Sequence, residues 1–164
     1  DTFNCLGEVN GMIVYSHIGY GLTQAYDATN HKLLWENPQF VLSDVVGVWE
    51  GTLVGVIWQR HSAFDEAPGI VVGLAPLTGK ELWRGESGII DSVHLMEGRL
   101  FYTKEGQPEV RFLDPRSGAP IVSISFDKHI DSHRATLTDG MIVMVGEDPA
   151  LFSDLEEQVI IIRP

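Results

Sequence analysis

The side chains most able to do chemistry in this chain are histidines and aspartates near expected strand ends and loops. They are His61, His94, His129, His133, Asp91 and Asp131. Imidazole and carboxylate groups are ordinary ligands for divalent metals. Because the chain has neither a His-Glu-x-x-His nor a Cys-x-x-Cys spacing, we interpret these histidines as solvated or hydrogen-bonded and assign no metal site.

Patterns for nucleophilic catalysis or phosphate binding are weaker still. Asp131, Ser132 and His133 are consecutive, and consecutive strand residues point to opposite faces, so they cannot meet as a catalytic triad. No Gly-x-Ser-x-Gly elbow is present, and Thr78-Gly79-Lys80 lacks the Gly-x-x-x-x that precedes these residues in a P-loop. The sequence therefore assigns no catalytic residue and no cofactor, and it favours a protein that is not an enzyme.

The charge balance is the strongest compositional signal. The 164-residue chain carries 11 basic and 23 acidic residues, a formal net charge of −12. This charge opposes binding to nucleic acid or anionic membranes and would accelerate association with a basic protein. No apolar run approaches the length of a membrane span, and the single Cys5 cannot form an internal disulfide.

The chain is a repeat array. Its clearest unit is Val71–Arg84, VVGLAPLTGKELWR, and weaker copies lie at Gln24–Glu36 and Val110–Ser123. Each copy reads as an apolar strand, a turn cluster and a second apolar strand. Aligning Trp35 with Trp83 gives a period of 48 residues, and a further step of 39 reaches the third copy.

A second landmark, glycine after Asn, Glu or Asp, recurs at intervals of 40, 47 and 42 residues. The pairs are Asn10-Gly11, Glu50-Gly51, Glu97-Gly98 and Asp139-Gly140, each followed by an apolar run. Glycine in this context predicts a two-residue hairpin turn. Each unit therefore holds four short strands, and four-stranded repeats with periods in the forties are typical of propeller blades.

An apolar strand ending in Leu-Asp, a Thr-Gly-Lys turn and then Leu-Trp resembles the pyrroloquinoline-quinone-type (PQQ-like) β-propeller repeat. Leu77–Trp83 carries the turn intact, and Tyr26-Asp27 with Leu34-Trp35 keep parts of the pattern. The third repeat keeps Leu113-Asp114 and Ser117-Gly118 and has no tryptophan. The resemblance implies a β-propeller fold and favours the cell envelope or periplasm as its location.

The same resemblance bears on cofactor binding and on the tryptophans. Members of the family that bind the quinone typically cover it with a vicinal cysteine pair, which a chain with one cysteine cannot form. Trp35 and Trp83, at the outer-strand position of the repeat, are expected to pack between blades. Trp49 and Trp58 flank a hairpin and are expected in the core.

We therefore expect an all-β fold built from β-propeller blades of four antiparallel strands, in about four repeats. The expected blades are residues 1–37, 38–85, 86–126 and 127–164, within a single repeat domain that could belong to a larger propeller. The last blade would lack its outer strand, which leaves an unpaired edge. Three completions stay open: further blades of a larger ring, a second copy of this chain, or a strand donated by another chain.

Two long connections between second and third strands combine acidic residues with phenylalanine. Their residues are Phe64, Asp65 and Glu66 in the first, and Glu147, Asp148, Phe152, Asp154, Glu156 and Glu157 in the second. In a blade such connections lie opposite the tight turns, and long irregular loops often carry binding function. We call these residues the acidic loop face and expect a protein partner to bind there, with simple solvated loops as the alternative.

Two classes of function follow from these patterns. The first is a non-enzymatic propeller scaffold that binds a basic protein through the acidic loop face, in its sharper form an immunity or inhibitor protein that masks a basic toxin such as a nuclease. The alternative is a segment of a quinone- or metal-dependent dehydrogenase whose catalytic residues lie elsewhere in the ring.

Overall fold

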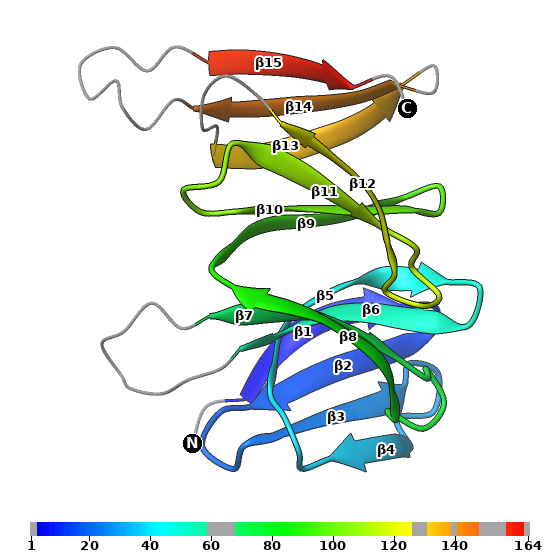
Figure 1. The fold of residues 1–164 in the computed structure, drawn as a ribbon. Helices are drawn as coiled ribbons and strands as arrows, with labels where there is room; N and C mark the ends of the chain where they lie inside the picture. The colour runs from blue at the N-terminus through cyan, green and yellow to red at the C-terminus, as the bar shows by residue number, and fades with distance from the viewer. Residues whose placement is uncertain (1–2, 59–67, 126–130, 139–140, 148–156, 163–164) are drawn as a thin grey trace. The chain divides into compact units, whose positions relative to one another are not determined.

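The structure, a computed structural model, describes residues 3–58, 68–125, 131–138, 141–147 and 157–162. For residues 58, 91, 131–138, 145–147 and 157–160 it describes the backbone alone. Every regular element in the described residues is a β-strand, which confirms the predicted all-β class (Figure 1). The described part of the chain contains no helix long and apolar enough to cross a membrane.

Each strand pairs antiparallel with the next one along the chain, within four up-and-down sheets. The orders are β1-β2-β3-β4, β5-β6-β7-β8 and β12-β11-β10-β9, with β13-β14-β15 as the described strands of the last sheet. This arrangement confirms the prediction of antiparallel, propeller-like blades of four strands. The bounds are Phe3–Val9 (β1), Met12–His17 (β2), Leu22–Asp27 (β3), Leu33–Asn37 (β4), Leu42–Trp49 (β5), Thr52–Trp58 (β6), Gly69–Leu74 (β7), Glu81–Gly88 (β8), Ile90–Met96 (β9), Arg99–Lys104 (β10), Glu109–Leu113 (β11), Pro120–Ser125 (β12), Asp131–Thr138 (β13), Met141–Glu147 (β14) and Glu157–Ile162 (β15).

The predicted two-residue turns join the first two strands of the sheets. The φ angles are 49° and 75° at Asn10-Gly11, 43° and 82° at Glu50-Gly51, and 47° and 77° at Glu97-Gly98. Two successive positive φ angles are the mark of a type I′ turn, whose twist matches that of the strands it joins. The two glutamates therefore turn as the asparagine does, and Asp139-Gly140 lies outside the described residues.

One strand is longer than the sequence predicts. We expected β8 to end at Arg84, but Ser87 pairs with Ile70 and Gly88 pairs with Gly69. A register shift between Ile70 and Val72 separates these pairs from the rest of the ladder. A register shift of this kind changes the direction of a strand without ending its pairing. Because it interrupts the alternation of apolar and polar residues, the sequence does not mark the strand beyond it.

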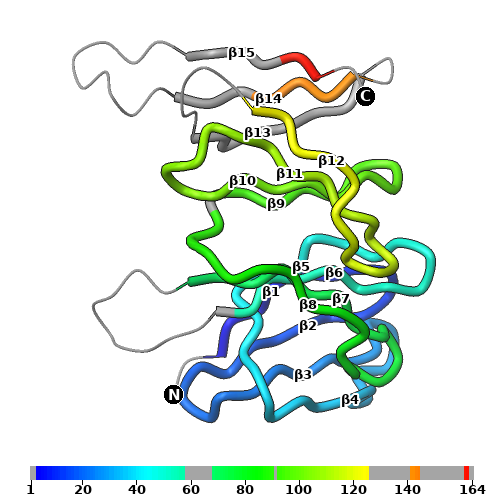
Figure 2. Tube along the Cα trace, viewed as in Figure 1, coloured from blue at the N-terminus to red at the C-terminus, as the bar shows by residue number. Residues whose placement is uncertain are grey.

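The chain divides into two compact units, which are described separately. The first comprises residues 1–88 together with the turn 115–119, and the second comprises residues 89–114 and 120–164. The tube in Figure 2 follows the up-and-down path of the chain from β1 to β4. In the second unit, Phe101, Val110 and Phe112 of β10 and β11 share a core with Ile142, Met144 and Ile162 of β14 and β15.

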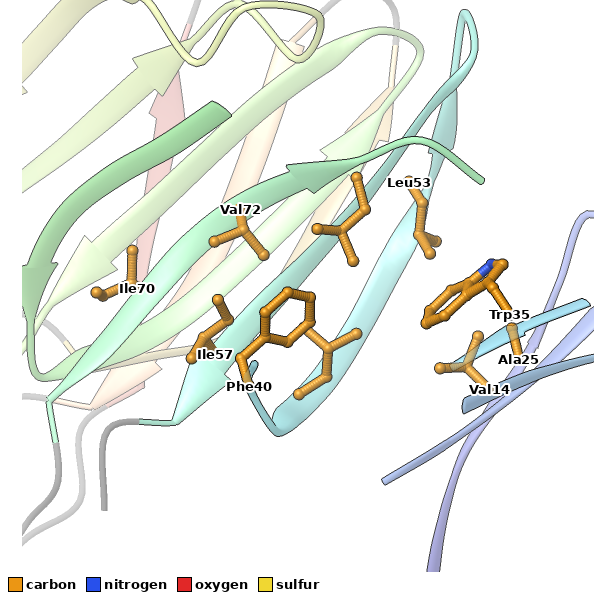
Figure 3. Packing of buried hydrophobic residues seen from close by; sticks show 10 residues of the cluster. Val14, Ala25, Trp35, Phe40, Leu53, Ile57, Ile70 and Val72 are labelled. Carbon is orange, nitrogen blue, oxygen red and sulfur yellow. The ribbon is translucent and has the colours of Figure 1, made fainter. Parts of the chain in front are cut away.

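In the first unit, sheets β1–β4 and β5–β8 share one apolar core. Val14, Ala25 and Trp35 come from the first sheet, and Leu53, Ile57, Ile70 and Val72 come from the second (Figure 3). The buried Thr23 hydrogen-bonds to the segment that connects β4 to β5. Its Oγ1 donates to the Phe40 carbonyl at 3.2 Å and accepts from the Leu42 amide at 2.9 Å. This threonine satisfies two backbone groups that the crossing would otherwise leave unpaired inside the core.

The fourth-strand tryptophans of the first two sheets dock in the same way. Trp35 is 6% exposed, and its Nε1 donates to the Pro76 carbonyl at 2.6 Å. Its ring lies against Gly79, where any Cβ would overlap the indole. Trp83 repeats this contact on the turn that joins β11 to β12, donating to the Pro115 carbonyl at 3.0 Å with its ring against Gly118. The expectation that these tryptophans pack between repeats is confirmed.

The third repeat, which has no tryptophan, differs from the first two at the corresponding pair of the ladder. Trp35 pairs with Ala25 and Trp83 pairs with Gly73, so a large ring always lies opposite a small residue. At the equivalent pair of the third repeat the sizes are exchanged, because Phe112 lies opposite Val122. Phe112 is buried in the core of the second unit, and Val122 at the tryptophan position is exposed.

The expectation that Trp49 belongs to the core is wrong. Trp49 ends β5 beside the Glu50-Gly51 turn and is 36% exposed. The side chain of Trp58 lies outside the description. The apolar pattern of the hairpin does not distinguish this exposed position from a buried one.

Candidate binding surfaces

The structure describes the strand ends to which the two long connections attach. Trp58 pairs with Gly69 and Glu147 pairs with Glu157, and both pairs lie at the end of their sheet opposite the turn between its first two strands. Phe64, Asp65, Glu66, Asp148, Phe152, Asp154 and Glu156 lie outside the described residues. Glu147 and Glu157, described in their backbone only, are Cα partners at the end of the β14–β15 ladder and so stand at the base of the second connection.

A second surface is a pocket on the first sheet, on the side away from the core of the first unit. It has a volume of about 380 Å³ and is lined by Phe3, Ile13, Tyr15, Tyr26 and His31. We call it the aromatic pocket. Its side chains come from β1, β2, β3 and the β3–β4 turn, so all belong to one sheet.

Strand alternation explains how these residues meet. In β2, Met12 and Val14 face the core, and Ile13 and Tyr15 therefore face the other side. The ladder pairs Ile13 with Tyr26, and directly opposed residues of an antiparallel pair share a face. Tyr15 and Tyr26 then meet on the diagonal, with ring centroids 5.8 Å apart and planes at 84°.

A chain of hydrogen bonds joins the pocket to a carboxylate. The Tyr26 hydroxyl donates to Gln24 Oε1 at 3.1 Å, and Gln24 Nε2 donates to Glu36 Oε2 at 2.7 Å. The amide of Gln24 thereby holds Glu36 beside the tyrosines. Glu36 is exposed, and no lysine or arginine in the described residues lies within ion-pair distance of it.

The β3–β4 turn carries a further negative charge. The backbone N–H groups of Asn30 and Thr29 donate to Asp27 Oδ1 at 3.0 and 2.8 Å. These bonds stabilise the carboxylate and hold the pKa of Asp27 below its ordinary value. His31 in the same turn has a φ of 58°, an uncommon backbone conformation for a residue other than glycine.

Phe3 has a second aromatic neighbour next to the pocket. The rings of Phe3 and the buried His17 meet edge to face with centroids 4.1 Å apart, and the ring centroids of His17 and Tyr20 are 4.2 Å apart. His17 Nδ1 accepts from the Tyr20 amide at 3.1 Å. Phe3 and Tyr20 nevertheless remain 61% and 68% exposed, which leaves a large apolar surface at this edge of the sheet.

Sequence reasoning missed the aromatic pocket, although a signal for it existed. Residues 12–15, MIVY, are apolar at both alternating sets of positions, and this pattern indicates a strand that presents apolar side chains on both faces. Among the described residues, no group of three His, Cys, Asp or Glu side chains could hold a metal ion. Of the histidines considered as metal ligands, only His94 has a described side chain, because His61 and His129 lie outside the described residues and His133 is described in its backbone only.

The sheets and their docked tryptophans define the class of fold as an all-β, propeller-like repeat array. Neither a protein-family model nor a curated protein matches the sequence. Solved structures do match it, and two of them make the likeness specific.

BamB from Moraxella catarrhalis matches with a TM-score of 0.60 and 14% identity, over 91% of this chain and 46% of that chain. Quinohemoprotein alcohol dehydrogenase from Comamonas testosteroni matches with a TM-score of 0.58 and 13% identity, over 84% of this chain and 28% of that chain. The chain therefore spans about half the length of the first protein and less of the second. At these identities the likeness shows the fold, which is that of a PQQ-like propeller.

Proposed function

We propose that this chain is a propeller scaffold that binds a basic protein partner through the acidic loop face, as an immunity or inhibitor protein that masks a basic toxin such as a nuclease. The observation that carries the proposal is the net charge of −12, with acidic residues concentrated in the two long connections. The propeller-like fold supports it, because up-and-down sheets hold such connections at the end opposite the tight turns.

The physical advantage of this arrangement is rapid and selective capture. A surface rich in carboxylates attracts a basic protein over distances of about a Debye length, roughly 10 Å at 0.1 M salt, and raises the association rate. The substrate-binding groove of a nuclease is lined by the cations that hold phosphates, so carboxylates placed there would block it. Phe64 and Phe152 would add apolar anchors within the acidic patch.

The test compares two variants with equal changes in charge. Asp65→Lys/Glu66→Lys alters the acidic loop face, and Glu50→Lys/Glu97→Lys alters exposed residues in two of the tight turns. Each protein is immobilised, proteins of the source organism are captured at low and high salt, and the association rate of the captured protein is measured.

We expect the wild-type chain and the turn variant to capture the same basic protein, and the loop variant to associate about tenfold more slowly with a flatter salt dependence. An unchanged association rate for the loop variant at low salt would refute the acidic loop face as the binding surface. Equal slowing by both variants would show that net charge alone governs binding.

A second candidate function rests on the likeness to a quinohemoprotein alcohol dehydrogenase. In this reading the chain would be a segment of a quinone- or metal-dependent dehydrogenase. The single Cys5 counts against it, because the family's quinone sites typically use a vicinal cysteine pair. The discriminating measurement is the visible absorbance of the chain after incubation with pyrroloquinoline quinone and Ca²⁺ followed by gel filtration; retained quinone would favour the dehydrogenase.

A further inference from the structure

We propose that the aromatic pocket of sheet β1–β4 binds an arginine side chain presented by a partner protein. This site stands apart from the acidic loop face, because none of its lining residues belongs to the long connections. Binding of arginine at this pocket can therefore be tested independently of binding through the acidic loop face.

The β3–β4 turn of the first sheet cannot receive a tryptophan as the corresponding turns do. Counting back the 48-residue period from Gly79 leads to His31, and Gly118 is the third member of the set. All three have similar φ angles, 58°, 64° and 67°. At both glycines a Cβ would overlap the docked indole, and His31 carries that Cβ and an imidazole beyond it. The occupant of the pocket is therefore not another blade docked through its tryptophan.

The geometry of the rings suits a planar cation. Tyr15 and Tyr26 stand at 84° to each other, so their ring faces point in different directions, and a guanidinium would stack on one face at a time. Cation–π attraction operates within about 6 Å of a ring centroid, and arginine adds planar stacking that lysine lacks. Ile13 and Phe3 provide apolar contact for the methylene stem of the side chain.

Charges of both signs lie around the pocket, with carboxylates in excess. Lys32 follows His31 in the β3–β4 turn, and Lys80 lines a separate hollow with Glu36. Glu8 pairs with Ile13 across the β1–β2 ladder, and Glu36 pairs with Gln24 across the β3–β4 ladder, so a carboxylate flanks the aromatic rows on each side. No lysine or arginine occurs among the residues of β1, β2, β3 and β4. The hydrogen bond from Gln24 to Glu36 leaves the other carboxylate oxygen for an arginine N–H.

The experiment uses three blocked peptides that differ at one residue. Acetyl-Gly-Arg-Gly-amide is the probe, its citrulline counterpart has nearly the same shape without the charge, and its tryptophan counterpart reports apolar docking. Binding is followed by aromatic ¹H–¹³C NMR of Tyr15 and Tyr26 at low salt. A second readout is the alkylation rate of Cys5, the only cysteine, which is Tyr15's partner in the β1–β2 ladder.

We expect the arginine peptide to shift both tyrosine signals and slow Cys5 alkylation, with affinity at least about tenfold above that of the citrulline peptide. Tyr15→Leu and Glu36→Gln should each weaken binding about fivefold. Glu97→Gln, an equal charge change at an exposed turn of another sheet, should leave binding unchanged, as should Asp65→Lys/Glu66→Lys. Because Glu36→Gln alters an exposed side chain, it tests the site without disturbing the core.

Three outcomes would overturn the proposal. Equal binding of the arginine and citrulline peptides would make the pocket an apolar site without preference for a cation. Tighter binding of the tryptophan peptide would assign it to an aromatic side chain. Tyrosine shifts that depend on protein concentration without peptide, with a dimer mass by light scattering, would show that a second copy covers it.

Discussion

Replacing Gly79 by alanine tests the docking of tryptophan on the β7–β8 turn. Gly79 has a φ of 64° and lies under the ring of Trp35, whose Nε1 is fixed by the Pro76 carbonyl. Alanine meets two separate penalties there. A left-handed backbone costs an L-residue about 1–2 kcal/mol, and crowding in a packed site costs about 1–3 kcal/mol, so Gly79→Ala should cost about 2–5 kcal/mol.

The matched control is Gly21→Ala in the same unit. Gly21 has a φ of 69°, and no atom lies within 4 Å of a Cβ added there. This variant should show the backbone penalty alone, about 1–2 kcal/mol. The difference between the two variants therefore isolates the contact between the turn and the Trp35 ring.

The assay is urea unfolding followed by circular dichroism, from which the free energy of unfolding is obtained for each variant. A third measurement introduces Gly79→Ala into a Trp35→Leu variant. Because the indole ring is absent there, the contribution of steric crowding to the loss of unfolding free energy should disappear. If Gly79→Ala and Gly21→Ala agree within about 0.5 kcal/mol, the indole does not constrain the turn and the reasoning fails. The same result would remove the steric argument about His31.

Two further predictions concern the second tryptophan and the turn carboxylate. Trp83→Ala should cost about 3–5 kcal/mol in urea melts, whereas Trp49→Ala, at a 36% exposed position, should cost less than about 1 kcal/mol; a loss below 1 kcal/mol for Trp83 would contradict its docking role. Because the folded-state pKa of Asp27 lies below its unfolded value of about 3.9, the carboxylate stabilises the fold above that pH, and this contribution disappears as the pH falls through the folded-state pKa. Thermal melts from neutral to acidic pH should show this acid-dependent loss in the wild-type chain and not in Asp27→Asn, and parallel profiles would count against it.

The strands and tight turns could be predicted because local chemistry determines them. Glycine after Asn or Glu permits the successive positive φ angles that Asn10-Gly11 and Glu97-Gly98 adopt. Alternating apolar residues between such turns then define each strand and its buried face. The longer β8 escaped prediction because its last pairs follow an irregularity that no alternation marks.

The role of the tryptophans could be predicted only in outline. The period of 48 residues places Trp35 and Trp83 at one structural position, and a large buried indole needs a partner for its N–H. Which carbonyl accepts that hydrogen bond depends on the packing of distant segments, 41 residues apart for Trp35 and 32 for Trp83. Trp49 is also a tryptophan, but it is 36% exposed, whereas Trp35 and Trp83 are buried. Residue type alone therefore does not decide which tryptophan docks.

The two candidate sites also differ in how far the sequence alone predicts them. Composition and spacing alone predict the acidic loop face, since charge and loop length can be read from consecutive residues. The aromatic pocket depends on strand register: Phe3, Tyr15, Tyr26 and His31 meet only after four segments align, and a shift of one residue would send each strand's side chains to the opposite face. The sequence by itself determined the repeats, the turns and the net charge. The tertiary structure decided which aromatic rings meet and which turn excludes a tryptophan, because those properties arise from contacts between residues far apart in the chain.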